Sequence, residues 1–196
     1  MAKILKSDLN NSSISSMKTL LSNEISDAEK LISSLTSLIE DTSDELKGKG
    51  FDAIRQQVSL YISALNSRKK AAESLKDSIS LGISTMNNFM ESYDMLDDSE
   101  LSTITTDINS ISATINQIEY NYYNGVYKDE EGNNKVTLNS LIGNYRTQLN
   151  ELNKLKEKLS QLNSTDSSAF SSVESAKDLV ISYKTSVNEI QESNIV

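Results

Sequence analysis

The sequence has no proline, cysteine, histidine or tryptophan in its 196 residues, and these absences exclude several kinds of chemistry. Without cysteine or histidine there is no thiolate nucleophile, no Ser-His-Asp triad and none of the usual ligand sets of structural zinc sites. The lack of cysteine also excludes disulfide bonds. We therefore expect a protein that is not an enzyme, with no catalytic residues, no bound metal and no cofactor.

Positive charge and long apolar runs are also scarce. Lys and Arg number 19 against 28 Asp and Glu, so the net charge is −9, and this field repels nucleic acid. The longest apolar runs, Leu60–Ile62 and Leu179–Ile181, fall far short of the roughly 20 residues that a spanning helix needs. The N-terminal residues lack the apolar core of a signal peptide. We expect no nucleic-acid partner, no transmembrane segment and no cleavable signal peptide.

Serine and asparagine are abundant, with 34 and 19 residues, and both are poor formers of helix interiors. Leu, Ile, Val and Phe together still account for 50 of the 196 residues, above the level of roughly 20% that is typical of disordered chains. Such a composition favours long helices that each bury one narrow stripe over a compact domain with a thick core.

The apolar residues follow the spacing of three and four that is typical of one helical face. This spacing predicts a first long helix over about 12–46 and a second over 51–96, where only Arg68 and Gly82 interrupt the apolar stripe. Glycine readily takes the left-handed conformation that closes a helix, so we predict an antiparallel hairpin over 12–96 that reverses at Gly48 and Gly50.

The second half of the sequence predicts three further helices, over 101–122, 138–162 and 169–190. The acidic segment 97–100 supplies a turn and a helix N-cap, and the polar segment 163–167 is expected to be a loop. A short β-hairpin is expected near 121–139, because β-favouring residues flank a polar tip there. The fold class is therefore all-α, an elongated bundle of long antiparallel helices in a single domain over 1–196, with a helical half over 100–190.

Two local motifs could suggest ligand binding, and neither fits. A calcium loop with its glycine on Gly132 would place Leu138 where a bidentate glutamate is required. The pair Gly48 and Gly50 lacks the third glycine, the preceding strand and the Lys-Ser/Thr pair of a phosphate-binding loop.

Two long helical patterns near the N-terminus flank the segment Asp44-Glu45-Leu46-Lys47-Gly48-Lys49-Gly50-Phe51-Asp52-Ala53-Ile54. In this setting the chain resembles the LXG domain of type VII secretion effectors, and Leu46-Lys47-Gly48 corresponds to the Leu-x-Gly motif of that family. The resemblance extends over essentially the whole chain. LXG domains are similar to an enlarged form of the small Trp-x-Gly helical hairpins that the same machinery secretes, whereas this sequence has no Trp.

The resemblance implies a targeting and adaptor module without catalytic activity. LXG domains carry variable C-terminal toxin domains out of Gram-positive bacteria, and they pair with small helical partner proteins of the Trp-x-Gly type before export through the type VII apparatus. The implied localisation is cytoplasmic before export and secreted afterwards, without a cleavable signal peptide. No such toxin domain lies within these 196 residues.

Two other functions compete with this interpretation. One is a coiled-coil structural protein that self-associates along the stripe from Phe51 to Leu96. The other is a helical pore-forming toxin whose membrane tongue would be the segment 121–139, although the acidic and amide residues at the tip of that segment argue against membrane insertion.

The apolar stripes of the first two helices are wider than one helix–helix seam. A two-helix hairpin buries only one face of each helix, so the surplus must contact the remaining helices or another protein. The candidate partner interface comprises Ile25, Ile32, Ile39, Leu60 and Ile62. Cover by the chain's own fourth and fifth helices is the competing explanation. Leu46, in turn, is expected to pack within the hairpin tip.

Overall fold

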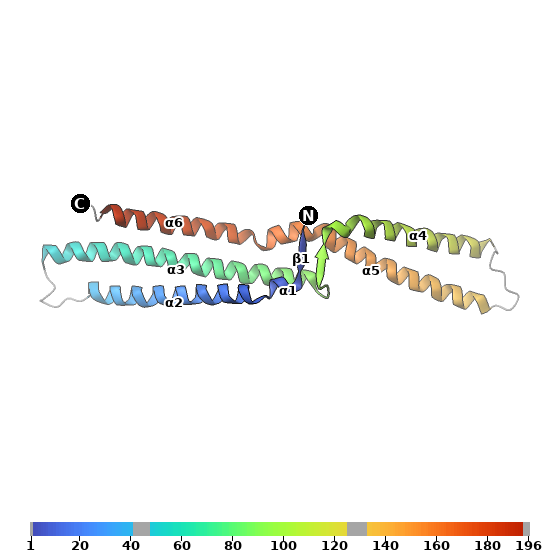
Figure 1. Cartoon of the computed structure of the whole chain (residues 1–196), viewed down its shortest axis with the longest axis horizontal. Helices are drawn as coiled ribbons and strands as arrows, with labels where there is room; N and C mark the ends of the chain where they lie inside the picture. The colour runs from blue at the N-terminus through green and yellow to red at the C-terminus, as the bar shows by residue number, and fades with distance from the viewer. Residues whose placement is uncertain (1, 41–47, 125–132, 194–196) are drawn as a thin grey trace. The chain divides into compact units, whose positions relative to one another are not determined.

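The computed structural model of the chain describes residues 2–40, 48–124 and 133–193 (Figure 1). The described elements are helices, apart from one small antiparallel sheet, so the predicted all-α class with long antiparallel helices is confirmed. In chain order the elements are β1 (Lys3–Leu5), α1 (Lys6–Leu9), α2 (Ser12–Glu40), α3 (Lys49–Met90), β2 (Met95–Asp97), the 3-10 helix η2 (Asp98–Glu100), α4 (Leu101–Tyr123), α5 (Asn133–Ala169) and α6 (Ser171–Ser193).

The residues group into two compact units, and each unit joins segments that are distant in the sequence. Unit 1 consists of residues 1–6 and 89–165, and unit 2 consists of residues 7–88 and 166–196. The division therefore falls inside α3 and α5, rather than between the hairpin over 12–96 and the helical half over 100–190 that the sequence suggested.

In unit 2, α2 and α3 form the predicted antiparallel pair, side by side in Figure 1. The segment just before α2 lies opposite the end of α3, and the middle of α2 lies opposite the middle of α3, as antiparallel packing requires. The polar contacts between the two helices include an ion pair between Glu24 and Arg68 and an ion pair of 2.7 Å between Glu29 and Lys69. Just before α2, Asn10 forms a hydrogen bond of 3.1 Å with Asn87 of α3.

The third helix of unit 2 is α6, and the junction between α5 and α6 packs against α3 at a glycine. A Cβ atom added to Gly82 would lie 2.5 Å from two ring carbons of Phe170 and 2.9 Å from the carbonyl oxygen of Ala169. These distances are shorter than atomic contact allows, so the two segments approach this closely because position 82 has no side chain. The prediction that Gly82 lies within the second helix is confirmed.

Unit 1 is built on the sheet and on the pair α4 and α5. Strand β1 pairs antiparallel with β2, with Ile4 opposite Leu96, and Leu96 is almost completely buried. The buried residues of α4 recur at the spacing of one helical face, and those of α5 lie near its C-terminal end; they are Ile104, Ile108, Ile115, Leu159 and Leu162. An ion pair of 2.7 Å between Glu119 and Arg146 joins the two helices near their other ends.

The second long helix ends earlier than its apolar stripe predicts. The stripe continues to Leu96, but α3 stops at Met90 and Leu96 belongs to β2. Glu91 has a φ of 49°, and this left-handed conformation ends the helix. The backbone of 91–97 is instead used to reach β1, and Leu96 is buried from a strand rather than from a helix. The prediction of a helix over 91–96 is therefore wrong.

The predicted loop at 163–167 is also wrong, because α5 continues through it to Ala169. The polar residues of this segment favour a loop by local propensity, but Leu162 and Ala169 on either side of it are both buried. Tertiary packing of those two residues outweighs a propensity difference of a few tenths of a kcal/mol per residue. The break between α5 and α6 falls at Phe170 instead.

The position predicted for the β-hairpin, 121–139, is wrong in its described parts. Residues 121–123 belong to α4 and residues 133–139 belong to α5, while 125–132 lie outside the described residues. The small sheet is formed by β1 and β2, which are more than eighty positions apart. Such a pairing leaves no local turn signal in the sequence.

Gly48 has the left-handed conformation that the sequence predicted, with a φ of 120°. Its role differs from the predicted helix stop, because its carbonyl oxygen accepts hydrogen bonds from the amides of Phe51 and Asp52 and so begins α3. Gly50 lies inside α3. Leu46 lies outside the described residues.

Candidate functional site

Unit 1 contains a cavity of about 950 Å³ along α5, bounded by the turn 91–93 and by one residue of α4. Half-buried Ile111, Leu152 and Leu155 supply its apolar lining. Ser92 and Tyr93 of the turn also line it, and the remaining lining side chains are charged or amide groups of α5 and of the turn; they are Glu91, Gln148, Glu151, Lys154, Glu157, Lys158 and Gln161. A cavity of this size with a mixed lining is large enough for a peptide segment or a small ligand.

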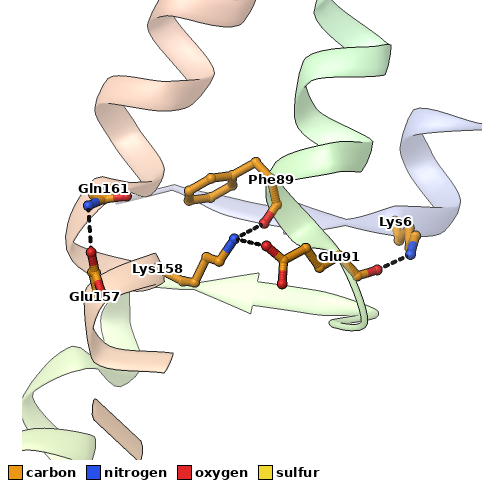
Figure 2. Close-up of polar contacts among 6 residues, drawn as sticks. All are labelled: Lys6, Phe89, Glu91, Glu157, Lys158 and Gln161. Carbon is orange, nitrogen blue, oxygen red and sulfur yellow. Dashed lines mark hydrogen bonds and ion pairs between the residues drawn. The ribbon is translucent and has the colours of Figure 1, made fainter. Parts of the chain in front are cut away.

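The ammonium group of Lys158, one of the lining residues, reaches the end of α3 (Figure 2). It donates hydrogen bonds of 2.7 Å to the carbonyl oxygen of Phe89 and 2.9 Å to the Oε1 atom of Glu91, and it lies 4.8 Å from the centroid of the Phe89 ring. Lys6 donates in turn to the carbonyl oxygen of Glu91. These contacts connect α5, the end of α3 and the start of α1 around Glu91, the residue whose left-handed conformation ends α3.

Two carboxylates of unit 1, those of Glu91 and Asp97, have lowered pKa values. The hydrogen bond from Lys158, followed by its positive charge, lowers the pKa of Glu91 below its ordinary value. Next to the sheet, hydrogen bonds from the hydroxyl and amide of Ser99 and from Lys3 lower the pKa of Asp97. Both groups are accessible to solvent, so each acts as a local tether of its segment rather than as a buried catalytic acid.

These two carboxylates should make stability fall in acid. A carboxyl group whose pKa is lower in the folded state contributes stability above its unfolded pKa and loses it as the pH falls through the folded value. We expect Asp97→Asn to flatten the decrease in melting temperature below about pH 4, the ordinary range of aspartate, as measured by circular dichroism. Ser99→Ala removes one hydrogen bond to Asp97 but keeps the contact with Lys3, so it should flatten the decrease in melting temperature less than Asp97→Asn does. An unchanged slope in Asp97→Asn would contradict a tethering role.

The residues that the sequence proposed as a partner interface all lie in unit 2. Ile25, Ile32 and Ile39 on α2 and Ile62 on α3 are half-buried, while Leu60 is 42% exposed. The three isoleucines lie on the same side of α2 as the buried Ala28, within the face turned to the bundle. Whether a partner contacts any of them stays a prediction.

The exposed part of the wide α2 stripe lies beside those isoleucines. Leu20 is 68% exposed, Leu31 is 51% exposed and Leu38 is 42% exposed. Their separations of eleven and seven positions are close to three and two turns at about 3.6 residues per turn, so the three side chains line one face. We call these three residues the α2 leucine face. The width of the stripe indicates more apolar residues than one helix–helix seam buries. Only the packing of α2 shows which of the two sides of the stripe is exposed.

Other exposed apolar residues of unit 2 lie on α3 and α6, and they include Ile54, Tyr61, Leu81 and Ile181.

In the described residues no helix is long and apolar enough to cross a membrane. Over the same residues, no group of three or more acidic side chains is arranged to hold a metal ion.

Comparisons with protein-family models, with curated proteins and with solved structures found no match to this chain.

Proposed function

We propose that the chain is a non-catalytic targeting and adaptor module of an LXG effector, which binds small helical partner proteins of the Trp-x-Gly type for export through a type VII secretion apparatus. In this proposal the protein is cytoplasmic before export and is then secreted without a cleavable signal peptide. The observation that supports partner binding is the α2 leucine face, whose three large apolar side chains are between 42% and 68% exposed although α2 packs with α3 and α6.

A helical partner suits this face better than a small ligand does. The three leucines extend along about five turns of one helix, and two helices pack by inserting such ridges of side chains into each other's grooves. Exposed side chains of this size on a single face are typical of interaction sites, because burying each one removes apolar surface from water. Polar and charged residues, among them Asp27 and Lys30, lie beside the leucines as the rim of such an interface would.

Aspartate substitutions on the α2 leucine face should abolish partner binding without unfolding the chain. Co-expression with candidate small helical proteins, followed by affinity purification and titration calorimetry, measures the binding. We expect Leu31→Asp and Leu38→Asp each to weaken it by about thirtyfold or more, the effect of losing an interface hot spot of about 2 kcal/mol. The melting temperature of the isolated chain should change little.

Two control variants separate an interface from the domain's own core. Ser37→Asp adds the same charge to an exposed position next to Leu38 on another face of α2, and should leave binding unchanged. Ile32→Asp places the charge on the half-buried face and should unfold the domain. Full partner binding by Leu31→Asp would contradict the proposed face. A stable homodimer in light scattering that Leu31→Asp dissociates would favour the self-associating coiled-coil protein instead.

A further inference from the structure

The cavity of unit 1 is a second candidate interface, independent of the α2 leucine face and of the proposed function. We propose that it binds a basic amphipathic helix of another protein, with the apolar side of that helix on Leu152 and Leu155 and its Lys or Arg side chains against Glu151 and Glu157. Three properties of the cavity support this occupant: its shape, its apolar floor and the balance of its charges.

The shape suits a helix. The lining residues of α5 run from Gln148 to Gln161, which at 1.5 Å per residue is a length of about 20 Å. The floor is made of half-buried Ile111, Leu152 and Leu155, so an apolar side chain placed there leaves water without burying an unpaired polar group. The turn 91–93 closes one side. An amphipathic helix of about four turns matches this length and this division into apolar floor and polar rim.

The charges favour a basic occupant. Three carboxylates and two ammonium groups line the cavity, and Lys158 is already bonded to the Phe89 carbonyl and to Glu91. Glu151 and Glu157 are exposed at the rim, where Lys154 is the exposed ammonium group among the lining residues and Gln161 donates a hydrogen bond of 3.4 Å to Glu157. The rim therefore attracts positive charge, and the aliphatic stem of a Lys or Arg can lie along the leucines while its head reaches a carboxylate.

A second copy of the chain is a poorer occupant. Each copy has a net charge of −9, so two copies repel one another on approach, and this repulsion is strongest at low salt. A partner with an excess of Lys or Arg has the opposite behaviour, because its association is faster and tighter at low salt.

The test uses the full chain and two synthetic peptides of about 18 residues, long enough to form helix. Both carry one leucine stripe and a single tryptophan, with lysine at the remaining positions of one peptide and glutamate in the other. Because the protein has no tryptophan, the peptide fluorescence alone reports binding. We expect saturable binding of the lysine peptide that weakens with added salt, and no binding of the glutamate peptide.

Charge reversal on the rim should reverse this preference. Glu151→Lys combined with Glu157→Lys should weaken the lysine peptide by about tenfold, from two rim contacts of up to about 1 kcal/mol each, and should give binding of the glutamate peptide. The matched control is Asp107→Lys combined with Asp178→Lys, which alters the net charge equally at exposed positions outside the cavity. It should change the affinity less than about twofold, a difference of under roughly 0.4 kcal/mol.

Three results would overturn the inference. They are the absence of saturable binding by the lysine peptide, equal weakening by the cavity and control variants, and binding that Leu152→Ala leaves unchanged. Leu31→Asp on the α2 leucine face should not affect the lysine peptide. Loss of partner binding in Leu31→Asp therefore tests the proposed function, while the peptide titration tests this cavity, and either can fail alone.

Discussion

Leu162→Ala is expected to lower the free energy of unfolding by about 2–5 kcal/mol, the largest single-residue effect we anticipate in unit 1. Leu162 is completely buried near the C-terminal end of α5, so truncation removes its contacts and leaves a cavity that the neighbouring helices fill only in part. Chemical denaturation followed by circular dichroism measures the loss as a lower midpoint with an unchanged slope.

The matched control is Leu141→Ala, the same substitution in the same helix at a side chain that is 41% exposed. It should cost less than about 1 kcal/mol, because less apolar surface is returned to water and no closed cavity forms. Equal losses for the two variants would show that the burial of Leu162 does not contribute to stability as we infer.

Gly82→Ala is expected to destabilise unit 2 by about 1–3 kcal/mol, although alanine is the better helix former. The added methyl group would lie 2.5 Å from the Phe170 ring and 2.9 Å from the Ala169 carbonyl oxygen, and the carbonyl belongs to backbone that cannot move freely. Either the junction of α5 and α6 shifts away from α3 or the ring leaves its rotamer, and both reduce the packing. Thermal unfolding should show a lower melting temperature.

Gly143→Ala provides the opposite control. Gly143 also lies inside a helix, but a Cβ atom added there would have no neighbouring atom within 4 Å, so alanine should stabilise the chain by about 0.5–1 kcal/mol. Combining Gly82→Ala with Phe170→Leu should recover part of the loss, because the shorter side chain gives the methyl group room. A stabilising Gly82→Ala would mean that the close approach of α3 and the junction of α5 and α6 is not maintained in solution.

The helices could be predicted because their information is local. Each long helix places apolar side chains every three or four residues, and this spacing is readable without knowing what the stripe packs against. The spacing located α2, α4 and most of α3 and α5, and it placed Gly82 inside a helix where the structure has it. The sequence does not show which side of the wide α2 stripe stays exposed, because the width of a stripe carries no information on which of its sides α3 and α6 cover.

The errors occur where distant segments meet. The helix over 91–96 was predicted from an unbroken stripe, yet Leu96 contributes its side chain to unit 1 from a strand that pairs with residues more than eighty positions away. The loop at 163–167 was predicted from polar residues, yet the burial of Leu162 and Ala169 keeps that segment helical. In both places, the contacts between remote residues are worth more than the local preference of the segment for helix or for loop.

The sequence by itself determined the class of this protein: long helices, no thiol or imidazole chemistry and a strong negative charge, all of which follow from residue types and their spacing. Only the tertiary structure decided that the junction of α5 and α6 packs on α3 at Gly82, that Glu91 ends α3, and that Lys158 bonds to the end of α3 beside a cavity. The physical reason is that a helix forms from neighbours in sequence, whereas a bundle, a sheet and a cavity depend on which remote stripes bury one another.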